Sequence, residues 1–143
     1  MKIFTSLCMV VLLLVANSGF SQKPENWTKE QLMEPFVLAE VLQLNKQVPL
    51  IISVGPGAVI PNSVAVGPGQ EANNIEKLKK ELSAINRDSA VVIYCGCCPF
   101  ANCPNVRPAI ALLKDLNFTN YKLLNLTHNV KTDWLDKGYP SIK

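Results

Sequence analysis

The chain has 143 residues, of which 48% are hydrophobic and 17% charged, and its formal net charge is +3. A chain of this length and apolar content fills one hydrophobic core, so we expect a single domain with no room for a second. The positive charges are few and scattered. One group of lysines is expected on the solvated face of a helix: Lys77, Lys79 and Lys80. The composition therefore gives no support to nucleic-acid binding.

The first 22 residues have the pattern of a secretory signal peptide. Lys2 precedes an apolar run at residues 8–16, and small and polar residues follow as far as Gln22. The run is shorter than the about 20 residues that a membrane-spanning helix needs. We therefore expect residues 1–22 to be a signal peptide and residues 23–143 to be an exported domain, periplasmic or secreted, with no membrane attachment after cleavage.

Four elements are predicted in the first half of this domain, after a polar stretch at residues 23–33 that we expect to wrap its outside. A proline suited to a first helical position opens a short amphipathic helix over residues 35–45. Residues 50–54 are apolar and β-branched, which predicts a buried strand. A short extended piece at residues 59–66 lies between two Gly-Pro-Gly turns, and residues 71–85 carry the apolar stripe of another helix.

The second half is organised around a strand at residues 91–94, which is apolar at every position and is typical of a strand buried on both faces of a parallel sheet. Helical spacing predicts a helix over residues 108–116, ended by Asn117 in a left-handed conformation. A last strand at residues 121–126 and a helix around residues 131–137 follow. Strands that alternate with helices predict an α/β fold with a parallel sheet.

A loop at residues 95–107 joins the central strand to the following helix and contains four cysteines: Cys95, Cys97, Cys98 and Cys103. Open α/β sheets place their ligand sites in such loops at the carboxyl ends of strands. Loop N–H groups and the positive end of the following helix favour a thiolate there. Because an exported protein meets an oxidising compartment, structural disulfides are the alternative interpretation.

Two residues near this loop carry specific predictions. Cys103 directly precedes Pro104, a residue suited to a first helical turn, so we expect Cys103 to ionise most readily of the three additional thiols. His128 is the single histidine of the chain and follows the last strand. Because parallel strands end at the same edge of a sheet, the turn at His128 is predicted to overhang the cysteine loop.

The order of these motifs resembles a rhodanese-like domain over roughly residues 34–143. The motifs are a cysteine at a strand end, a loop closed by Arg107, a helix ending in Asn117-Phe118, a strand, and Trp134 followed by Gly138-Tyr139-Pro140. The loop from Cys95 to Arg107 is longer than the family's. Ser53 replaces an aspartate of the family, Gly55 replaces an arginine, and residues 127–129 replace a glycine pair.

The resemblance implies a rhodanese-like domain over residues 23–143 with a central parallel five-stranded sheet flanked by helices. It implies a sulfurtransferase in which Cys95 takes a sulfane sulfur as a persulfide from a small donor such as thiosulfate and passes it to a thiol acceptor. Arg107, the closing arginine, would hold the anionic donor. Sulfur transfer of this kind requires no cofactor.

Three functions therefore compete. In an exported sulfurtransferase, Cys95 carries the sulfur and Cys97, Cys98 or Cys103 acts as a resolving thiol. In a thiol–disulfide oxidoreductase, the Cys-x-x-Cys spacing of Cys95 and Cys98 is used instead. In a soft-metal protein, two to four thiolates take Cu(I) or Zn(II). The candidate ligands for that metal are Cys95, Cys97, Cys98, Cys103 and His128.

Overall fold

A computed structural model describes residues 27–142, so the predicted signal peptide at residues 1–22 lies outside the described residues. Its centre is a single sheet of five parallel strands in the order β1-β5-β4-β2-β3. The strands are β1 (Leu32–Met33), β2 (Leu50–Ser53), β3 (Ser63–Ala65), β4 (Val91–Tyr94) and β5 (Tyr121–Leu124). The prediction of an α/β fold with a parallel five-stranded sheet is confirmed.

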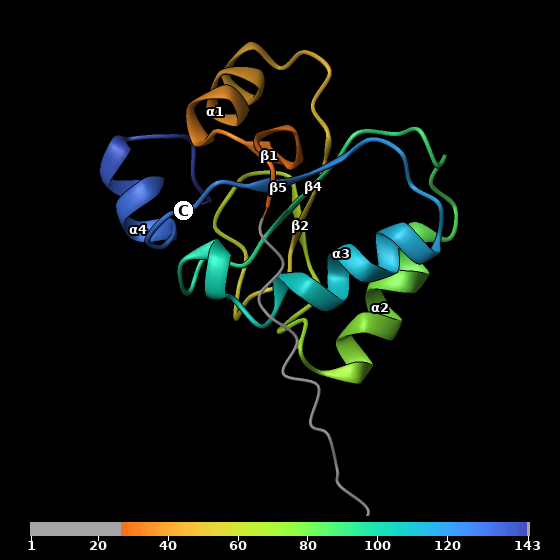
Figure 1. The fold of residues 1–143 in the computed structure, drawn as a ribbon. Coiled ribbons are helices and arrows are strands. Elements are labelled where there is room, and N and C mark those ends of the chain that lie inside the picture. Colours follow the sequence, from red (N-terminus) through yellow and green to blue (C-terminus); the bar gives the residue numbers. More distant parts are fainter. Residues whose placement is uncertain (1–26, 143) are drawn as a thin grey trace, which may run out of the picture.

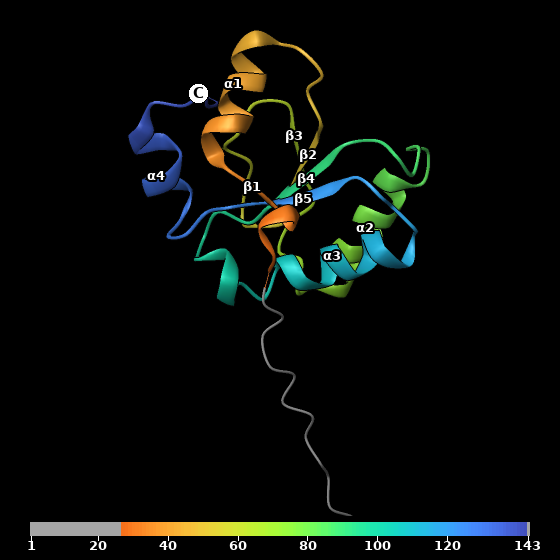
Figure 2. The same cartoon turned by 45° about the horizontal axis from the view of Figure 1, so that its top comes forward.

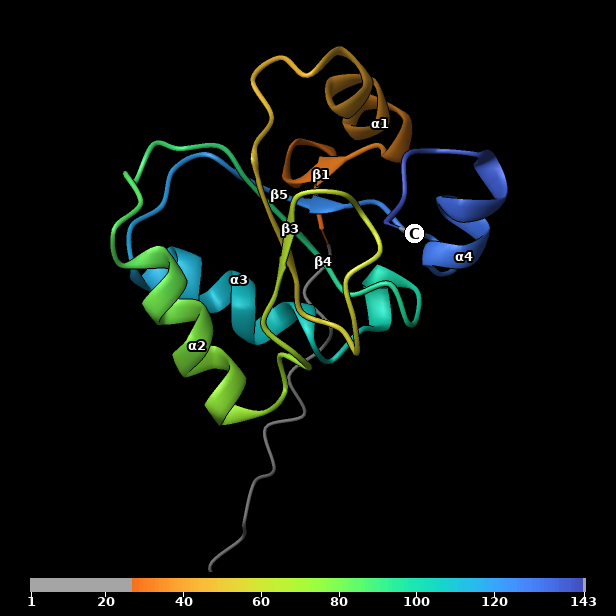
Figure 3. The same ribbon diagram turned by 180° about the vertical axis from the view of Figure 1, so that it is seen from behind.

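Four α-helices cover the two faces of this sheet. Helices α2 (Ala72–Leu82) and α3 (Val106–Asp115) lie side by side on one face, and α1 (Pro35–Leu44) and α4 (Val130–Asp133) lie on the other (Figures 1 and 3). Three short 3₁₀ turns complete the described elements, at Lys29–Gln31, Phe100–Asn102 and Leu135–Lys137. No helix within residues 27–142 is both long and apolar enough to cross a bilayer.

Strand β4 lies between β5 and β2 in the sheet (Figure 2). The domain has a cluster of buried apolar side chains on each face of the sheet, and β4 contributes to both. Successive side chains of a strand point to opposite faces. Val91 and Ile93 accordingly pack toward α2 and α3, while Val92 and Tyr94 pack toward α1 and α4. All four are buried, as the apolar run predicts. The chain therefore leaves β4 in the middle of the sheet, and Cys95 is the next residue.

Some boundaries differ from the predictions. The stretch at residues 23–33 is predicted to wrap the outside of the domain, but within it Leu32 and Met33 pair in parallel with β5 and form an edge strand. A two-residue strand is too short for periodicity to reveal. Helix α3 begins at Val106, two residues after Pro104, and the expected helix at residues 131–137 is divided into α4 and a 3₁₀ turn.

Candidate functional site

Cys95 is fixed at the carboxyl edge of the sheet by its neighbours on both sides. The Val54 N–H donates to the Tyr94 carbonyl oxygen at 2.8 Å, which continues the β2–β4 pairing up to Cys95. On the other side, the Val130 N–H donates to the Gly96 carbonyl oxygen at 2.9 Å. Gly96 has a φ of 85°, a left-handed conformation that glycine adopts without a steric penalty. The start of the cysteine loop is thus tied to both β2 and α4.

The four loop cysteines converge, as the sequence suggested. Their sulfur atoms all lie within 4.8 Å of one another, and each cysteine is a free thiol. Cys95 Sγ is 3.0 Å from Cys97 Sγ, which in turn is 3.3 Å from Cys98 Sγ. Cys95 and Cys103 are buried, Cys98 is half-buried and Cys97 is exposed. The cluster therefore extends from the core to the surface.

Hydrogen bonds to its sulfur favour the charged form of Cys95. They come first from the Cys103 side chain, then from the backbone and side chain of Cys97, and then from Asn105. Burial opposes them, yet the pKa of the Cys95 thiol is lowered to about 5. A donor that hydrogen-bonds to the charged form of a group stabilises that form. The lowered pKa favours the thiolate of Cys95 at neutral pH, which makes Cys95 the candidate nucleophile of the cluster.

Cys97 and Cys103 are held in the protonated form. Burial, followed by the neighbouring Cys95 and Cys98, raises the pKa of Cys97 to about 12. The hydrogen bond that Cys103 makes to Cys95 raises the pKa of Cys103 well above its usual range, and burial adds to this. The prediction that Cys103 ionises most readily of the three additional thiols is therefore wrong, because its pKa is raised further than that of Cys97. The helix begins too late to favour a thiolate there, and Cys103 acts as a donor to Cys95.

Asn105 belongs to the site although the sequence analysis did not single it out. Its side-chain Nδ2 donates to Cys95 Sγ at 3.3 Å, and its Oδ1 accepts from the Gln70 backbone N–H at 3.2 Å. The residue is buried and directly precedes α3. The sequence did contain a signal for this residue. Asparagine favours the position just before a helix, and Asn105 stands between the cysteine loop and the helix that follows it.

We expect Asn105→Ala to raise the pKa of the Cys95 thiol by about 1 to 2 units, because a hydrogen bond to a charged group contributes about 1.5–3 kcal/mol. The measurement is the pH dependence of Cys95 alkylation, followed by mass spectrometry. Asn102→Ala is the matched control, since Asn102 lies on the same loop but is exposed. An unchanged pKa in Asn105→Ala would remove Asn105 from the site.

Arg107, the predicted donor-binding residue, makes its contacts elsewhere. Its guanidinium donates to the Ala101 carbonyl oxygen at 2.8 Å and lies 5.9 Å from the centre of the Trp27 ring. The loop between Cys95 and Arg107 contains the 3₁₀ turn Phe100–Asn102, whose Phe100 N–H donates to the Leu126 carbonyl oxygen at 3.0 Å. Arg107 therefore fastens the outer part of the cysteine loop.

His128 also has a partner outside the cysteine cluster. Its ring Nδ1 lies 3.0 Å from Asp133 Oδ1, and its backbone N–H donates to Asp133 Oδ2 at 2.6 Å. Burial of the Asp133 carboxyl raises its pKa, but the bonds from His128 outweigh burial and lower it. The His128 side chain is 67% exposed. The side chain that faces Gly96 belongs to Val130 and not to His128. Among the described residues, the group of possible metal ligands consists of the four loop cysteines without His128.

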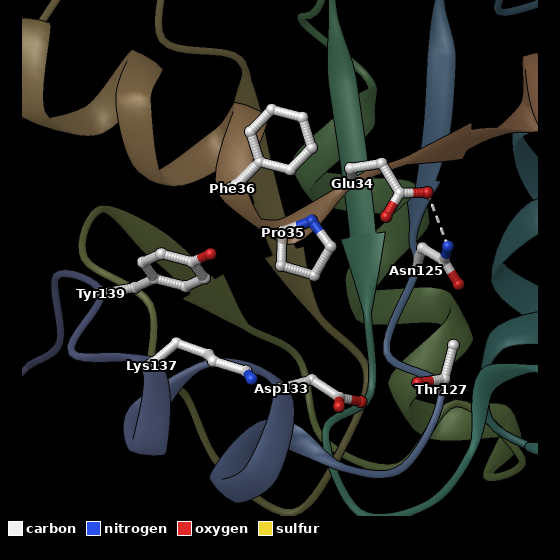
Figure 4. A pocket seen from close by; sticks show the side chains of 8 residues that line it. All are labelled: Glu34, Pro35, Phe36, Asn125, Thr127, Asp133, Lys137 and Tyr139. Atoms are coloured by element: carbon white, nitrogen blue, oxygen red, sulfur yellow. Dashed lines mark hydrogen bonds between the residues drawn. The ribbon is translucent and has the colours of Figure 1, made fainter.

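Two pockets adjoin this region. The first, of about 220 Å³, lies between α1 and the C-terminal segment and contains Glu34, Asp133 and Lys137 but no cysteine (Figure 4). The Asn125 side chain closes one side of it by donating to Glu34 at 2.7 Å. The second, of about 320 Å³, opens onto the cysteine loop. It is lined by Pro56, Gly57, Val59, Tyr94, Cys95, Gly96, Cys97 and Val130.

Tyr94 shapes the wall of the second pocket. Its hydroxyl oxygen accepts from the Val59 N–H at 3.0 Å and from the Ile60 N–H at 3.3 Å, and Ser63 Oγ lies 3.2 Å away. Ser53 Oγ donates to the Gly57 carbonyl oxygen at 2.6 Å. The loop after β2 is therefore held in place beside Cys95, where the pocket gives small molecules access to the nucleophile.

Comparison with family models and with curated proteins finds no match to this chain. The fold and the site alone define its class: a parallel-sheet α/β domain with four free cysteines clustered at the carboxyl edge of the sheet. Four thiolates on one metal ion with bonds of about 2.3 Å lie about 3.8 Å apart. The observed sulfur separations bracket this value, so the four cysteines are close enough together to hold a metal ion.

Proposed function

We propose that this domain is an exported sulfurtransferase-type protein that carries sulfane sulfur as a persulfide on Cys95. The observation that carries the proposal is the convergence of Cys103, Cys97 and Asn105 on Cys95 Sγ, which keeps this one sulfur ionised beside an open pocket. The parallel five-stranded sheet and the cysteine at its edge also agree with the rhodanese-like resemblance. A thiolate is the reactive form of cysteine toward a sulfane sulfur.

Loading follows from this geometry. The Cys95 thiolate attacks the outer sulfur of a donor R–S–S⁻, the donor's S–S bond breaks, and the remainder leaves as R–S⁻ with the electron pair. The product is a Cys95 persulfide whose outer sulfur carries the negative charge. The donors that stabilise the thiolate lie next to it and stabilise this charge as well.

Unloading has two routes. A thiol acceptor that enters the pocket attacks the outer sulfur and restores the Cys95 thiolate. In the second route, a neighbouring thiol attacks Cys95 Sγ, forms a disulfide and releases hydrosulfide, so that no external oxidant is needed. Cys97 is the best placed resolving thiol because its sulfur touches Cys95 at 3.0 Å and is exposed. Its raised pKa keeps it protonated, which delays this second route.

The test is to incubate reduced, metal-free protein with sulfane donors and to locate the added sulfur by fragmentation in the mass spectrometer. We expect one added sulfur on Cys95, removable by a reductant, in wild type and in Cys98→Ser. Cys95→Ser should keep its fold and acquire none. Sulfur that stays on another cysteine in Cys95→Ser contradicts the assignment, and disulfide formation without any added sulfur would indicate the oxidoreductase instead.

A second candidate is a soft-metal site, favoured by the four sulfur atoms within 4.8 Å of one another. Thiolate ligands select Cu(I) and Zn(II), and the Cys95 thiolate provides a first ligand without loss of a proton. Metal binding would then have to remove protons from Cys97 and Cys103, whose pKa values are raised. Affinity for either ion should therefore increase steeply with pH.

We expect His128→Ala to leave the affinity for Cu(I) and Zn(II) unchanged within about twofold, because the His128 ring pairs with Asp133 outside the cysteine cluster. Anaerobic competition titration measures this. Cys103→Ser is the matched comparison and should weaken any metal binding strongly. A large loss of affinity in His128→Ala would restore the histidine as a ligand.

A further inference from the structure

The pocket over Cys95 has an uncharged wall. Its lining includes Pro56, Gly57 and Val59 from the loop after β2 and Val130 from α4. Tyr94 contributes an aromatic ring, and its hydroxyl is occupied by the Val59 and Ile60 backbone N–H groups. Apart from the Cys95 thiolate, none of the described residues that line this pocket carries a charge.

The ionisable side chains that the sequence placed beside this loop, and Asp133, face other partners. Arg107 donates to the Ala101 carbonyl oxygen and lies over the Trp27 ring. His128 and Asp133 pair with each other, and Asp133 lines the separate pocket between α1 and the C-terminal segment (Figure 4). None of the three is among the residues that line the pocket over Cys95.

Charge and surface chemistry together restrict the sulfur donor. A dianion such as thiosulfate would have to enter a pocket whose described lining offers no cation to hold it. An apolar group gains free energy when it is buried against valine, proline and tyrosine. We propose, on the basis of the proposed sulfur-carrier function, that the donor is an organic hydropersulfide R–S–SH with an apolar R group, and not thiosulfate.

The reaction balances without a further reactant. The Cys95 thiolate attacks the outer sulfur of R–S–SH and forms a new S–S bond. The donor's own S–S bond breaks, and the inner sulfur leaves as R–S⁻ with the electron pair and takes up the proton that the outer sulfur gives up. The products are the Cys95 persulfide and the thiol R–SH. The Cys95 sulfur is oxidised and the inner sulfur of the donor is reduced to the same extent, so no other redox partner is needed. The apolar wall holds the R group, which points the outer sulfur at Cys95.

The experiment compares donors that differ in charge. Reduced, metal-free protein is mixed with benzyl hydropersulfide, with anionic 2-sulfonatoethyl hydropersulfide, or with thiosulfate. The rate of sulfur addition to Cys95 is followed by mass spectrometry. The rate of each hydropersulfide is divided by the rate of the same donor with N-acetylcysteine. This corrects for the different intrinsic reactivities of the two donors. We expect the benzyl donor to be roughly tenfold or more faster than the sulfonatoethyl donor, with thiosulfate slowest.

Gly57 offers a way to reverse this preference. It is exposed, and a Cβ at this position would meet nothing within 4 Å, so a longer side chain fits. Gly57→Lys places a cation at the pocket rim and should raise the rate with thiosulfate several-fold at low salt. Gly57→Gln has a side chain of similar length without charge and should bring no such gain. A gain in both variants would show that charge is not the cause and would contradict the proposal.

The outcomes separate this inference from the proposed function. If no donor adds sulfur to Cys95, both fail. If the anionic hydropersulfide or thiosulfate loads Cys95 as fast as the benzyl donor, the sulfur-carrier function stands and the apolar donor class is wrong. If benzyl hydropersulfide is preferred and Gly57→Lys shifts the preference toward thiosulfate, the donor class is supported.

Discussion

Gly55→Ala is expected to lower the free energy of unfolding by about 3 kcal/mol and to abolish the special reactivity of Cys95. An added Cβ at this position would lie 2.0 Å from the Cys95 carbonyl oxygen and 3.1 Å from its sulfur. The obstacle is backbone at the end of the central strand, so it has little freedom to move. The substitution must therefore displace either the loop after β2 or Cys95 itself, and both lie at the site.

Gly57→Ala is the matched control, because the same loop offers an open space two residues later. Urea unfolding followed by tryptophan fluorescence gives the stability of each variant, and alkylation kinetics give the reactivity of Cys95. We expect Gly57→Ala to resemble wild type in both measurements. Equal stabilities for Gly55→Ala and wild type would show that β2 and Cys95 do not approach each other this closely.

Trp134→Ala should have the largest effect on stability, a loss of about 3–5 kcal/mol. Trp134 is fully buried in the cluster that also contains Tyr94, and its indole N–H donates to the Pro140 carbonyl oxygen at 2.7 Å. The ring meets Tyr139 edge-on with centroids 5.2 Å apart. Removing it leaves a cavity beneath α4 and releases the C-terminal segment that follows.

The same substitution should slow the loading of Cys95, because α4 presents Val130 to Gly96 and to the pocket. Leu135→Ala provides the control, since Leu135 adjoins Trp134 in sequence but is 40% exposed. Thermal unfolding of the three proteins checks the order of stability. If Trp134→Ala and Leu135→Ala unfold at the same temperature, the indole ring does not stabilise the C-terminal segment.

The sequence was sufficient to predict the elements that carry a strong local signal. The buried strand at residues 91–94, the short helix from Pro35 and the left-handed Asn117, with a φ of 59°, are all found in the structure. Each depends on neighbouring residues and on backbone preferences that single residues impose. The position of Cys95 at a strand end followed from the same reasoning.

Features set by tertiary contacts could not be predicted in this way. Strand β1 exists because Leu32 and Met33 meet β5, not because two residues have a pattern. The roles of Asn105 and Cys103 depend on which side chains fold toward Cys95, and sequence spacing does not give that direction. The sequence positions of Arg107 and His128 suggested roles at the cysteine loop. In the structure, Arg107 donates to the Ala101 carbonyl oxygen and His128 pairs with Asp133, so both side chains contact other partners.

We expect Cys95 to be a thiolate nucleophile at neutral pH, and the pH dependence of its alkylation measures this property. Reduced, metal-free protein is treated with iodoacetamide between pH 4 and 10, and the rate at each cysteine is read by mass spectrometry. We expect the Cys95 rate to rise to a plateau with a midpoint near the lowered pKa of about 5, while Cys97, with its pKa raised to about 12, is still unreactive. A Cys95 midpoint near the ordinary thiol value of about 8.5 would contradict the account.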